Sequence, residues 1–331
     1  MAIGAGDVSA GDVSAGERKI AIVGAGLIGR AWAIAFSRGG CRVALFDPEA
    51  GVAAAARDLI AAALGDLADN GLLGGAAASD VLARVAVADS LAEAVEGALH
   101  VQENAPEALE IKIAVTAEIG ALAGPDTVLA SSTSGFVPSS FTEAVPGRER
   151  CLVAHPINPP YLLPAVELVP APWTDPAIVA RARAIMESIG MVPMTMIREA
   201  DGFVLNRLQS AFVYEAFRLV AEGYVTAQDL DRAVANGLGP RWSFMGPFET
   251  IDLNAPGGIR QYVERYAPLC ARIVASQTTP CDWRAALDGG IEAERAAALP
   301  RPAIAGRQAW RDRRLMALAA HKSDSDGKIG T

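Results

Sequence analysis

Short apolar runs alternate with longer helical segments through the first two hundred residues of this chain. The apolar runs are rich in branched and small residues and have the length of buried strands in a parallel sheet. The segments between them are rich in Ala and Leu. The pattern predicts strands at 20–23, 43–46, 85–87, 99–102, 127–130, 151–154, 165–169 and 192–196, and helices at 52–64, 91–95, 109–122 and 176–189. This alternation is typical of a doubly wound, mostly parallel α/β sheet.

The pattern changes after Gly202, beyond which no convincing strand is found. A long helix is expected at 203–222, with apolar residues on more than one side, as in a buried helix or an interface. Shorter helices are expected at 230–234, 259–266 and 308–320. Thr226 and Asp229 resemble a capping box before the first of these helices, and the Gly/Pro-rich stretch 237–240 is expected to end it.

The glycine-rich stretch after the first predicted strand has the full spacing of a dinucleotide-binding turn. Gly24, Gly26 and Gly29 form G-x-G-x-x-G, directly after an apolar strand and before a helical pattern. Gly24 permits a tight turn, Gly26 lets the backbone approach a pyrophosphate, and Gly29 allows close packing of helix on strand. The N-terminus of the helix, at Leu27 and Ile28, offers unpaired N–H groups to the phosphates.

Asp47 ends the second predicted strand, 23 residues after the first glycine of the motif. An acid at this point can accept hydrogen bonds from an adenosine ribose and repels a 2′-phosphate. Pro48 and Glu49 follow it, so no adjacent Lys or Arg would neutralise such a phosphate. The stretch therefore predicts NAD rather than NADP, and a glycine-rich turn without nucleotide function is the alternative.

These patterns divide the chain into three predicted segments. Residues 1–18, which contain Gly-Asp-Val-Ser-Ala twice in succession, are predicted to be a disordered tail. Residues 19–199 are predicted to form a Rossmann-type NAD-binding domain, and residues 200–331 an all-helical domain. The last ten residues, from Lys322, are expected to be frayed.

The chain has three histidines, and each is a candidate general base. His321 lies near the end that is expected to be frayed, and His100 lies inside an apolar strand, where a core or edge role is expected. His155 lies at the carboxyl end of a predicted strand, where open α/β sheets bind their ligands. The proline-rich loop 156–160 follows it and is expected to hold it rigidly.

Glu167 lies in the middle of the next apolar strand, where an unpaired carboxylate is costly to bury. If a turn at 158–163 pairs the two strands, Glu167 reaches His155 and fixes its tautomer. An imidazole held in this way is suited to remove a hydroxyl proton while a hydride leaves the same carbon. A structural histidine beside an edge glutamate is the alternative, which the residues alone leave open.

Two further polar residues are predicted to face the same site. Ser134 comes just after the carboxyl end of the strand at 127–130, where its hydroxyl could bind the reacting oxygen. Asn206 lies in the first turn of the long predicted helix and could point into a cleft between the domains. Taken alone, each residue is better explained as a turn or cap residue.

Composition argues against several other classes of protein. The 331 residues carry 29 basic and 38 acidic side chains, and a net charge of −9 makes an extended basic surface for nucleic acid or anionic lipid improbable. The four cysteines have no metal-binding spacing, which favours free thiols in a reducing compartment. No apolar run reaches the ~18 residues that span a bilayer. We therefore predict a cytoplasmic protein that binds neither nucleic acid nor membrane and holds no metal.

The candidate residues occur together in an order that resembles the L-3-hydroxyacyl-CoA dehydrogenase superfamily. The resemblance covers nearly the whole chain and is carried by the glycine motif, Asp47, Ser131-Ser132-Thr133-Ser134, His155-Pro156-Ile157-Asn158-Pro159, Glu167 and Gly202-Phe203-Val204-Leu205-Asn206-Arg207. It implies an N-terminal Rossmann domain and a helical C-terminal domain that forms a homodimer.

The resemblance also implies roles for individual residues. His155 and Glu167 would form a catalytic dyad, and Ser134 and Asn206 would contact the substrate oxygen and the nicotinamide side of the site. To the predicted cofactor-binding residues of the glycine turn and Asp47 we add two polar residues that follow predicted strands, Glu107 and Asn158.

The C-terminal half resembles one branch of that superfamily, the lambda-crystallins, which are L-gulonate 3-dehydrogenases. The stretches that carry this resemblance are 237–250, 253–255 and 310–316, of which carnitine dehydrogenases share only Gly-x-Arg-Trp-x-Phe. True acyl-CoA enzymes usually carry lysines after the second strand. Here the only basic residues between Gly51 and His100 are Arg57 and Arg84, so a small hydroxy acid with a free carboxylate is favoured over a multiply anionic CoA.

Arg241 is the candidate ligand for that carboxylate. It lies beside Trp242 in a predicted loop flanked by Gly and Pro, and a guanidinium can hold a carboxylate at two points. A salt bridge at the domain interface is the alternative.

The sequence thus predicts an NAD-dependent dehydrogenase that oxidises the 3-hydroxyl of a small L-3-hydroxy acid. Two alternatives stay open. The first is a short-chain L-3-hydroxyacyl-CoA dehydrogenase, which keeps the chemistry and changes the substrate. The second is a crystallin-like NAD-binding protein without relevant activity.

Overall fold

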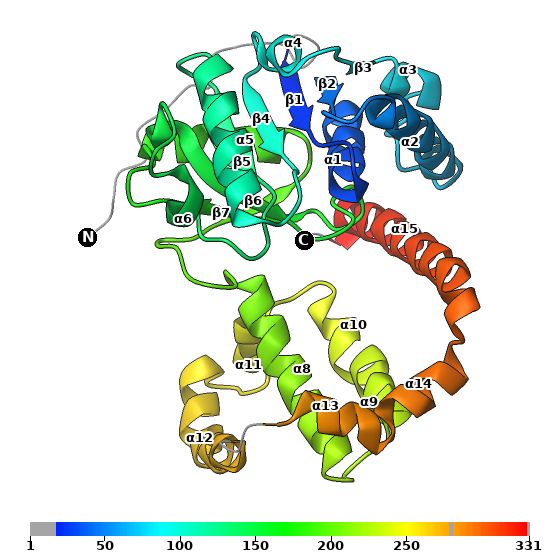
Figure 1. Cartoon of the computed structure of the whole chain (residues 1–331). Coiled ribbons are helices and arrows are strands. Elements are labelled where there is room, and N and C mark those ends of the chain that lie inside the picture. The colour runs from blue at the N-terminus through cyan, green and yellow to red at the C-terminus, as the bar shows by residue number, and fades with distance from the viewer. Residues whose placement is uncertain (1–17, 278–280, 330–331) are drawn as a thin grey trace. The chain divides into compact units, whose positions relative to one another are not determined.

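The computed structural model describes residues 18–277 and 281–329 (Figure 1). The chain divides into two compact units. The first extends to Asn206 and also includes Asp312–Asp324, and the second contains Arg207–Arg311 with the residues that follow 324. Apart from Arg18, the predicted disordered tail lies outside the described residues.

An eight-stranded sheet forms the centre of the first unit, in the order β3-β2-β1-β4-β5-β6-β7-β8. The strands are β1 (Lys19–Val23), β2 (Arg42–Phe46), β3 (Val85–Val87), β4 (His100–Glu103), β5 (Val128–Ser131), β6 (Cys151–Pro156), β7 (Ala165–Pro170) and β8 (Val192–Thr195). Neighbouring strands are parallel except β6 and β7. The predicted doubly wound sheet is confirmed, and its strand order reverses between β1 and β4, where such sheets bind ligands.

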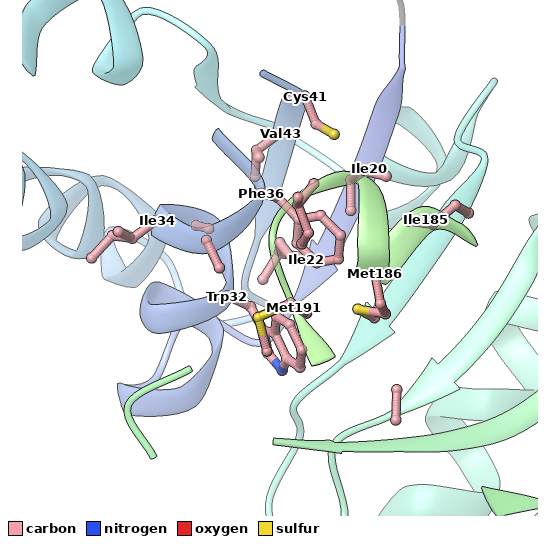
Figure 2. Packing of buried hydrophobic residues seen from close by; sticks show 14 of the residues in the cluster. Ile20, Ile22, Trp32, Ile34, Phe36, Cys41, Val43, Ile185, Met186 and Met191 are labelled. Atoms are coloured by element: carbon pink, nitrogen blue, oxygen red, sulfur yellow. The ribbon is translucent and has the colours of Figure 1, made fainter. Parts of the chain in front are cut away.

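Helices cover both faces of this sheet and enclose its two main apolar cores, and a smaller cluster contains Phe141, Val153, Val169 and Phe203. Helices α1 (Leu27–Arg38), α2 (Val52–Asp69) and α7 (Pro176–Ser188) contribute to one core, and α4 (Leu91–Val95) and α5 (Leu109–Leu122) to the other. Two short helices, α3 (Ala78–Leu82) and α6 (Ser139–Thr142), complete the unit. Figure 2 shows Trp32 and Phe36 of α1 packed among strand residues such as Ile22, all fully buried. Each such side chain contributes about 1.5–3 kcal/mol by burial, which fixes α1 and the turn before it on the sheet.

The C-terminal helix α15 (Ile304–Ile329) is longer than the pattern predicts. Residues from Lys322 onward were expected to be frayed, and this is wrong, because the helix continues to Ile329. Ser, Asp and Gly are poor helix formers, which is why 323–327 indicated a frayed end. The part of α15 in the first unit buries Met316 in the larger core, where its sulfur accepts a hydrogen bond from Asn70 at 3.6 Å. The first unit thus contains a segment that the sequence analysis assigned to the C-terminal domain.

The described residues of the second unit are helical and contain no strand. Its helices are α8 (Leu205–Ala221), whose first two residues belong to the first unit, and α9 (Ala227–Ala233), α10 (Gly239–Trp242), α11 (Pro247–Leu253), α12 (Gly258–Ser276), α13 (Trp283–Ala286) and α14 (Glu292–Ala298). The predicted capping box is confirmed, since the Asp229 backbone N–H donates to the Thr226 hydroxyl at 3.1 Å. Within the described ranges, no helix is both long and apolar enough to cross a membrane.

The predicted break at 237–240 is wrong. The chain instead continues from α9 through a π-helical turn, Val234–Leu238, directly into α10. Pro240 follows the π-helical turn and lies at the start of α10, where proline is tolerated. Arg241 therefore lies on a short helix and not in a loop.

Candidate active site

The glycine turn between β1 and α1 leaves room for a dinucleotide at one glycine and packs tightly at the other two. A Cβ on Gly24, whose φ is +92°, would lie 2.7 Å from the Asn104 carbonyl oxygen. A Cβ on Gly29 would lie 1.9 Å from the Gly24 carbonyl oxygen, whereas one on Gly26 would meet nothing within 4 Å. No described side chain caps α1 at Gly26, so its first turn keeps N–H groups for an anion. These residues fit the pyrophosphate of NAD.

Asp47 is tied to the same turn. One carboxylate oxygen accepts the Ala25 N–H at 2.8 Å and the other accepts the Glu49 N–H at 3.0 Å. The side chain is half-buried at the end of β2, next to the turn and therefore on the adenosine side of a Rossmann site. Its negative charge fits a ribose diol and opposes a 2′-phosphate.

His155 and Glu167 face each other across the antiparallel pair β6–β7. His155 Nδ1 lies 2.7 Å from Glu167 Oε2, and both residues are buried. The predicted contact is confirmed, and its cause is the predicted turn after β6. Nε2 of His155 makes no hydrogen bond within the described residues. The pair thus presents one ring nitrogen that is held and one that is available.

The second oxygen of Glu167 accepts hydrogen bonds from the backbone at the start of α8. Oε1 accepts the backbone N–H groups of Val204 at 2.7 Å and Leu205 at 3.0 Å. Burial alone would raise the pKa of Glu167, but the hydrogen bonds from His155 and from these two N–H groups outweigh it and hold the pKa below its ordinary 4.5. The N-terminus of α8 further favours the negative charge. The carboxylate therefore stays ionised beside His155.

Phe203 packs against the imidazole in an uncommon backbone conformation. Its φ is +50°, it is fully buried, and its ring centroid lies 5.5 Å from that of His155. A bulky residue in the left-handed region costs of order 1–3 kcal/mol, and such strain is concentrated at functional sites. Phe203 was not among the predicted site residues, although it lies in the family-like stretch Gly202–Arg207.

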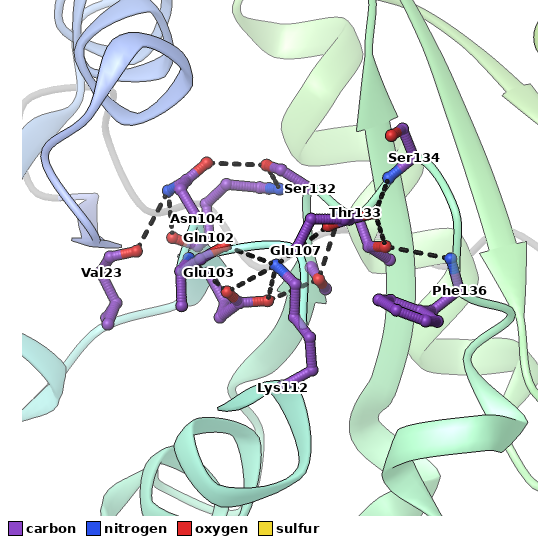
Figure 3. A network of polar contacts seen from close by, with 12 residues as sticks. Val23, Gln102, Glu103, Asn104, Glu107, Lys112, Ser132, Thr133, Ser134 and Phe136 are labelled. Carbon is purple, nitrogen blue, oxygen red and sulfur yellow. Dashed lines mark hydrogen bonds and ion pairs between the residues drawn. The ribbon is translucent and has the colours of Figure 1, made fainter. Parts of the chain in front are cut away.

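Ser134 lies on the loop after β5, and this loop donates three hydrogen bonds to Glu107 (Figure 3). Glu107 Oε1 accepts the Thr133 hydroxyl at 2.6 Å and the backbone N–H groups of Ser134 and Gly135 at 3.0 and 2.9 Å. Burial opposes ionisation of Glu107, but these hydrogen bonds and the charge of Lys112 hold its pKa below the ordinary value. Glu107 thus contacts the loop that carries Ser134, and its predicted role toward NAD stays a prediction.

The Ser134 side chain is exposed, and its hydroxyl makes no hydrogen bond within the described residues. Asn206 donates from Nδ2 to the Ser134 backbone carbonyl at 2.9 Å. The two residues predicted to bind the reacting oxygen are therefore in contact, although 72 positions apart. Asn206 reaches this loop because Glu167 fixes the beginning of α8 on the sheet.

A buried ion pair lies next to the same loop. Lys112 of α5 donates to Glu103 at 2.9 Å and to the Ala105 carbonyl at 2.9 Å, and the Ser131 hydroxyl donates to Glu103 at 2.5 Å. Lys112 is 1% exposed. Such a pair is stable in the interior because every charged atom has hydrogen-bond partners. This pair was not predicted; the signal was the single lysine of α5, nine residues after Glu103.

Comparison with known proteins assigns both halves of the chain to one family. Residues 19–200 match the NAD-binding domain of 3-hydroxyacyl-CoA dehydrogenase, and residues 202–287 match its C-terminal domain. The chain belongs to the 3-hydroxyacyl-CoA dehydrogenase family. It is an NAD-dependent oxidoreductase of that family, which confirms the predicted cofactor.

Two curated members of the family illustrate its range. Lambda-crystallin of Oryctolagus cuniculus is 40% identical over 306 residues, which cover 92% of this chain and 96% of that protein. L-carnitine dehydrogenase of Pseudomonas sp is 39% identical over 252 residues, which cover 76% and 77%. The first similarity agrees with the resemblance to lambda-crystallins that the sequence motifs indicate. The second has nearly the same identity over a smaller share of the chain.

Two solved structures are similar to this chain. The 5-formyl-3-hydroxy-2-methylpyridine 4-carboxylic acid 5-dehydrogenase, an NAD+-dependent dismutase, has a TM-score of 0.75 at 28% identity and covers 91% of this chain and 97% of its own. The 3-hydroxybutyryl-CoA dehydrogenase of Escherichia coli has a TM-score of 0.63 at 28% identity and covers 71% and 49%.

Two predicted site residues are not brought to the His155–Glu167 pair by any recorded contact. Asn158 is exposed two residues after β6 and makes no hydrogen bond within the described residues. Arg241 is exposed on α10 and forms no ion pair with the described residues of its own unit. Their roles in this dehydrogenase stay predictions.

The two basic residues of the segment after β2 donate hydrogen bonds to backbone carbonyl groups. Arg57 Nε donates to the Val85 carbonyl at 3.0 Å, and Arg84 donates to the Ser37 carbonyl at 2.8 Å. Both side chains are only partly exposed. Neither guanidinium is therefore fully available to a CoA nucleotide, which strengthens the argument made from the absence of lysine.

Proposed function

We propose that this dehydrogenase oxidises the 3-hydroxyl of a small L-3-hydroxy acid with a free carboxylate, as L-gulonate 3-dehydrogenases do. The observation that carries the proposal is the buried contact of 2.7 Å between His155 and Glu167, which leaves Nε2 of the imidazole available. It lies at the carboxyl edge of a sheet whose glycine turn fits NAD.

In this mechanism His155 is the general base. Nε2 accepts the proton of the substrate hydroxyl through its lone pair while the carbonyl bond forms at the same carbon. The glycine turn and Asp47 would hold NAD, which would supply the hydride acceptor for this carbon. Glu167 accepts the Nδ1–H of His155, which keeps the proton off Nε2 before the reaction and stabilises the imidazolium afterwards.

Ser134 and Asn206 orient the substrate oxygen in the proposed mechanism. The Ser134 hydroxyl is exposed and unpaired within the described part of the chain, so it can donate to the developing carbonyl oxygen. The Asn206 amide holds the backbone of the same residue at 2.9 Å, which limits the movement of that hydroxyl. Both effects favour a fixed angle between the hydroxyl and Nε2.

The substrate class is inferred from charge. The segment after β2 has no lysine, and its two arginines bind backbone carbonyls, so little is left there to pair with the phosphates of CoA. L-carnitine, the compound named in one relative, is itself a free 3-hydroxy acid, which supports a free carboxylate here. We propose Arg241 as the ligand of that carboxylate, because its side chain is exposed and forms no ion pair with the described residues of its unit.

A substrate screen tests the proposal. NADH formation is followed with L-gulonate, L-carnitine, free 3-hydroxybutyrate and 3-hydroxybutyryl-CoA, and kcat/KM is compared. A free acid is expected to give the highest value. A preference for the thioester would contradict the proposed substrate class but would leave the proposed oxidation of a 3-hydroxyl unchanged. Absence of turnover on the whole panel would favour a crystallin-like NAD-binding protein.

A second measurement tests Arg241. Replacement by Met removes the guanidinium and is expected to raise the KM for the acid at least tenfold, since a two-point charged contact is lost. Replacement by Lys keeps the charge and is expected to recover only part of the loss. Unchanged kinetics of the Met variant would remove Arg241 from the site.

We also propose that the protein is a homodimer that associates through its helical unit. Several large apolar side chains of that unit are exposed, among them Phe248 at 74%, Leu253 at 68% and Val274 at 61%. Exposed apolar groups in such number are typical of an interface. Light scattering is expected to give twice the chain mass at micromolar concentration, and a monomer would contradict the proposal.

A further inference from the structure

A chain of polar side chains, buried at His100 and Gln102 and partly buried at Ser132 and Asn104, runs along β4 toward the glycine turn (Figure 3). His100 Nε2 lies 2.9 Å from Gln102 Oε1, and Gln102 Nε2 donates to the Ser132 hydroxyl at 2.7 Å. That hydroxyl donates to Asn104 Oδ1 at 2.7 Å. Asn104 Nδ2 in turn donates to the Val23 carbonyl at 3.3 Å. None of these side chains has a role in the proposed reaction.

The partners of this chain fix the direction of every hydrogen bond. The Trp32 indole N–H, which can only donate, binds the Ser132 oxygen at 3.0 Å. Asn104 Nδ2 also donates to the Gln102 backbone carbonyl at 2.8 Å, so its oxygen must face Ser132. Ser132 therefore gives its single proton to Asn104 and accepts from Trp32 and Gln102.

Besides its hydrogen bond to Ser132, a second contact fixes the orientation of the Gln102 amide. Its nitrogen also donates to the Ala154 carbonyl at 3.2 Å, which accepts only. Its oxygen must therefore face His100, and His100 must donate from Nε2. His100 is fully buried, and its Nδ1 has no partner, so a second proton there would be an unpaired buried donor. Burial accordingly lowers the pKa of His100 to about 4, and the ring is neutral at pH 7.

The chain reaches three of the segments that form the site. The Val23 carbonyl directly precedes Gly24, and the Ala154 carbonyl directly precedes His155. Ser132 begins the loop that carries Ser134 two residues later. The backbone N–H of Asn104 also donates to the Val23 carbonyl, at 2.7 Å. One network thus connects β1, β5 and β6 at the switch point of the sheet.

We propose that Gln102, Ser132 and Asn104 are positioning residues that hold the glycine turn in register with the catalytic strand, and that His100 is the fixed donor at the start of this network. The inference uses the NAD-binding role of the domain but not the identity of the substrate. It predicts that disruption of the network weakens NAD binding even though no member is offered as a ligand of NAD.

Ser132→Ala is the first test, because it removes the hydroxyl at which three hydrogen bonds meet and leaves almost no void. The dissociation constant of NADH, measured by fluorescence titration, is expected to rise about tenfold, and the KM for NAD to rise with it. The KM for the hydroxy acid is expected to change less than twofold. A dissociation constant within twofold of wild type would overturn the proposal.

A matched control separates positioning from general loss of stability. Thr127 donates a buried hydrogen bond to the Ala98 carbonyl at 2.8 Å, next to the opposite end of β5. Thr127→Val removes this bond in the same sheet and is expected to lower the melting temperature without changing the dissociation constant of NADH. If both variants weaken NADH binding equally, the network has no special role in positioning.

The role of His100 is tested by a pair of substitutions. His100→Gln places an amide N–H near the position of Nε2, whereas His100→Phe keeps a ring beside Phe36 and removes the donor. The Phe variant is expected to bind NADH about as weakly as Ser132→Ala, and the Gln variant to bind within threefold of wild type. Equal loss in both would remove His100 from the network.

A direct readout does not depend on activity. In protein labelled with ¹⁵N-tryptophan, the indole N–H of Trp32 is expected to exchange slowly with solvent deuterium. Ser132→Ala should accelerate this exchange at least tenfold, because the indole loses its acceptor. Unchanged protection would show that the Ser132 hydroxyl is not that acceptor and would overturn the network. This measurement tests the hydrogen bonds at Ser132 even if a His100 variant fails to fold.

Discussion

His155 and Glu167 are direct partners in the β6–β7 ladder, and their side chains meet at 2.7 Å on the same face of the sheet. Directly opposed residues of an antiparallel pair have neighbouring Cβ atoms, so this contact needs no unusual conformation of either side chain. β6 and β7 are the antiparallel pair of this sheet. The reversal of direction after β6 is therefore what brings a base and an acid together within twelve residues.

His155→Ala is expected to lower kcat by at least two to four orders of magnitude, which is the usual contribution of a general base. NADH binding is expected to persist, because the glycine turn and Asp47 are untouched. Stopped-flow or steady-state rates and a fluorescence titration of NADH measure the two effects separately. Retention of near-full turnover would contradict the assignment of His155.

Glu167→Gln tests the tautomer of His155. The new amide can keep its oxygen on the N–H groups of Val204 and Leu205, so its nitrogen must donate to Nδ1. The ring proton then moves to Nε2, which can no longer accept a proton from the substrate. We expect kcat to fall by about 10²- to 10⁴-fold with little change in the KM for NAD.

Glu167→Ala is the matched comparison for that variant. It removes the acceptor of His155 and also releases the start of α8, so a loss of thermal stability is expected in addition to the loss of rate. If the Gln variant is fully active, Glu167 supports α8 and does not set the tautomer of His155.

The order of strands and helices was predictable because the six central strands of this sheet are largely buried on both faces and read as apolar runs, while the edge strands β3 and β8 are partly exposed. The contact between His155 and Glu167 was predictable for the same reason, since a carboxylate inside such a run requires a partner nearby. Asn206 and Ser134 could not be joined from sequence, because 72 residues separate them and their contact depends on where Glu167 fixes α8.

The two wrong predictions of secondary structure have local causes. The stretch 237–240 is rich in Gly and Pro and predicted a break, but Pro240 falls in the first turn of α10, where it is tolerated. The polar residues after Lys322 predicted a frayed end, although α15 continues to Ile329. The polar network from His100 to Asn104 was not predicted either, because its members come from separate segments and share no motif.

Asp47→Asn is expected to relax the preference for NAD. Asn keeps an acceptor for the Ala25 N–H, which Asp47 binds at 2.8 Å, so the turn should keep its conformation. The negative charge that opposes a 2′-phosphate is lost. We expect the ratio of kcat/KM for NAD to that for NADP to fall at least tenfold. An unchanged ratio would show that another group excludes NADP.

The stability of the protein is expected to fall as the pH is lowered from 6.5 to 4, and His100 is the main cause. Its pKa is about 4 in the folded protein, against an ordinary value of 6.5, so the unfolded chain binds more protons throughout this window. The stabilisation is complete above pH 6.5 and is lost toward pH 4, which amounts to about 3 kcal/mol of unfolding free energy.

The two carboxylates of the site titrate in the same direction at lower pH. Glu107 and Glu167 have pKa values below 4.5, so the stability that they contribute is lost only when the pH falls below that value. Urea denaturation of wild type and His100→Gln at pH 7.5, 6.5, 5.5 and 4.5 separates the contributions. The variant is expected to show a flat unfolding free energy between pH 6.5 and 4.5, where wild type declines. Parallel curves would assign the decline to other groups and would contradict a neutral, buried His100.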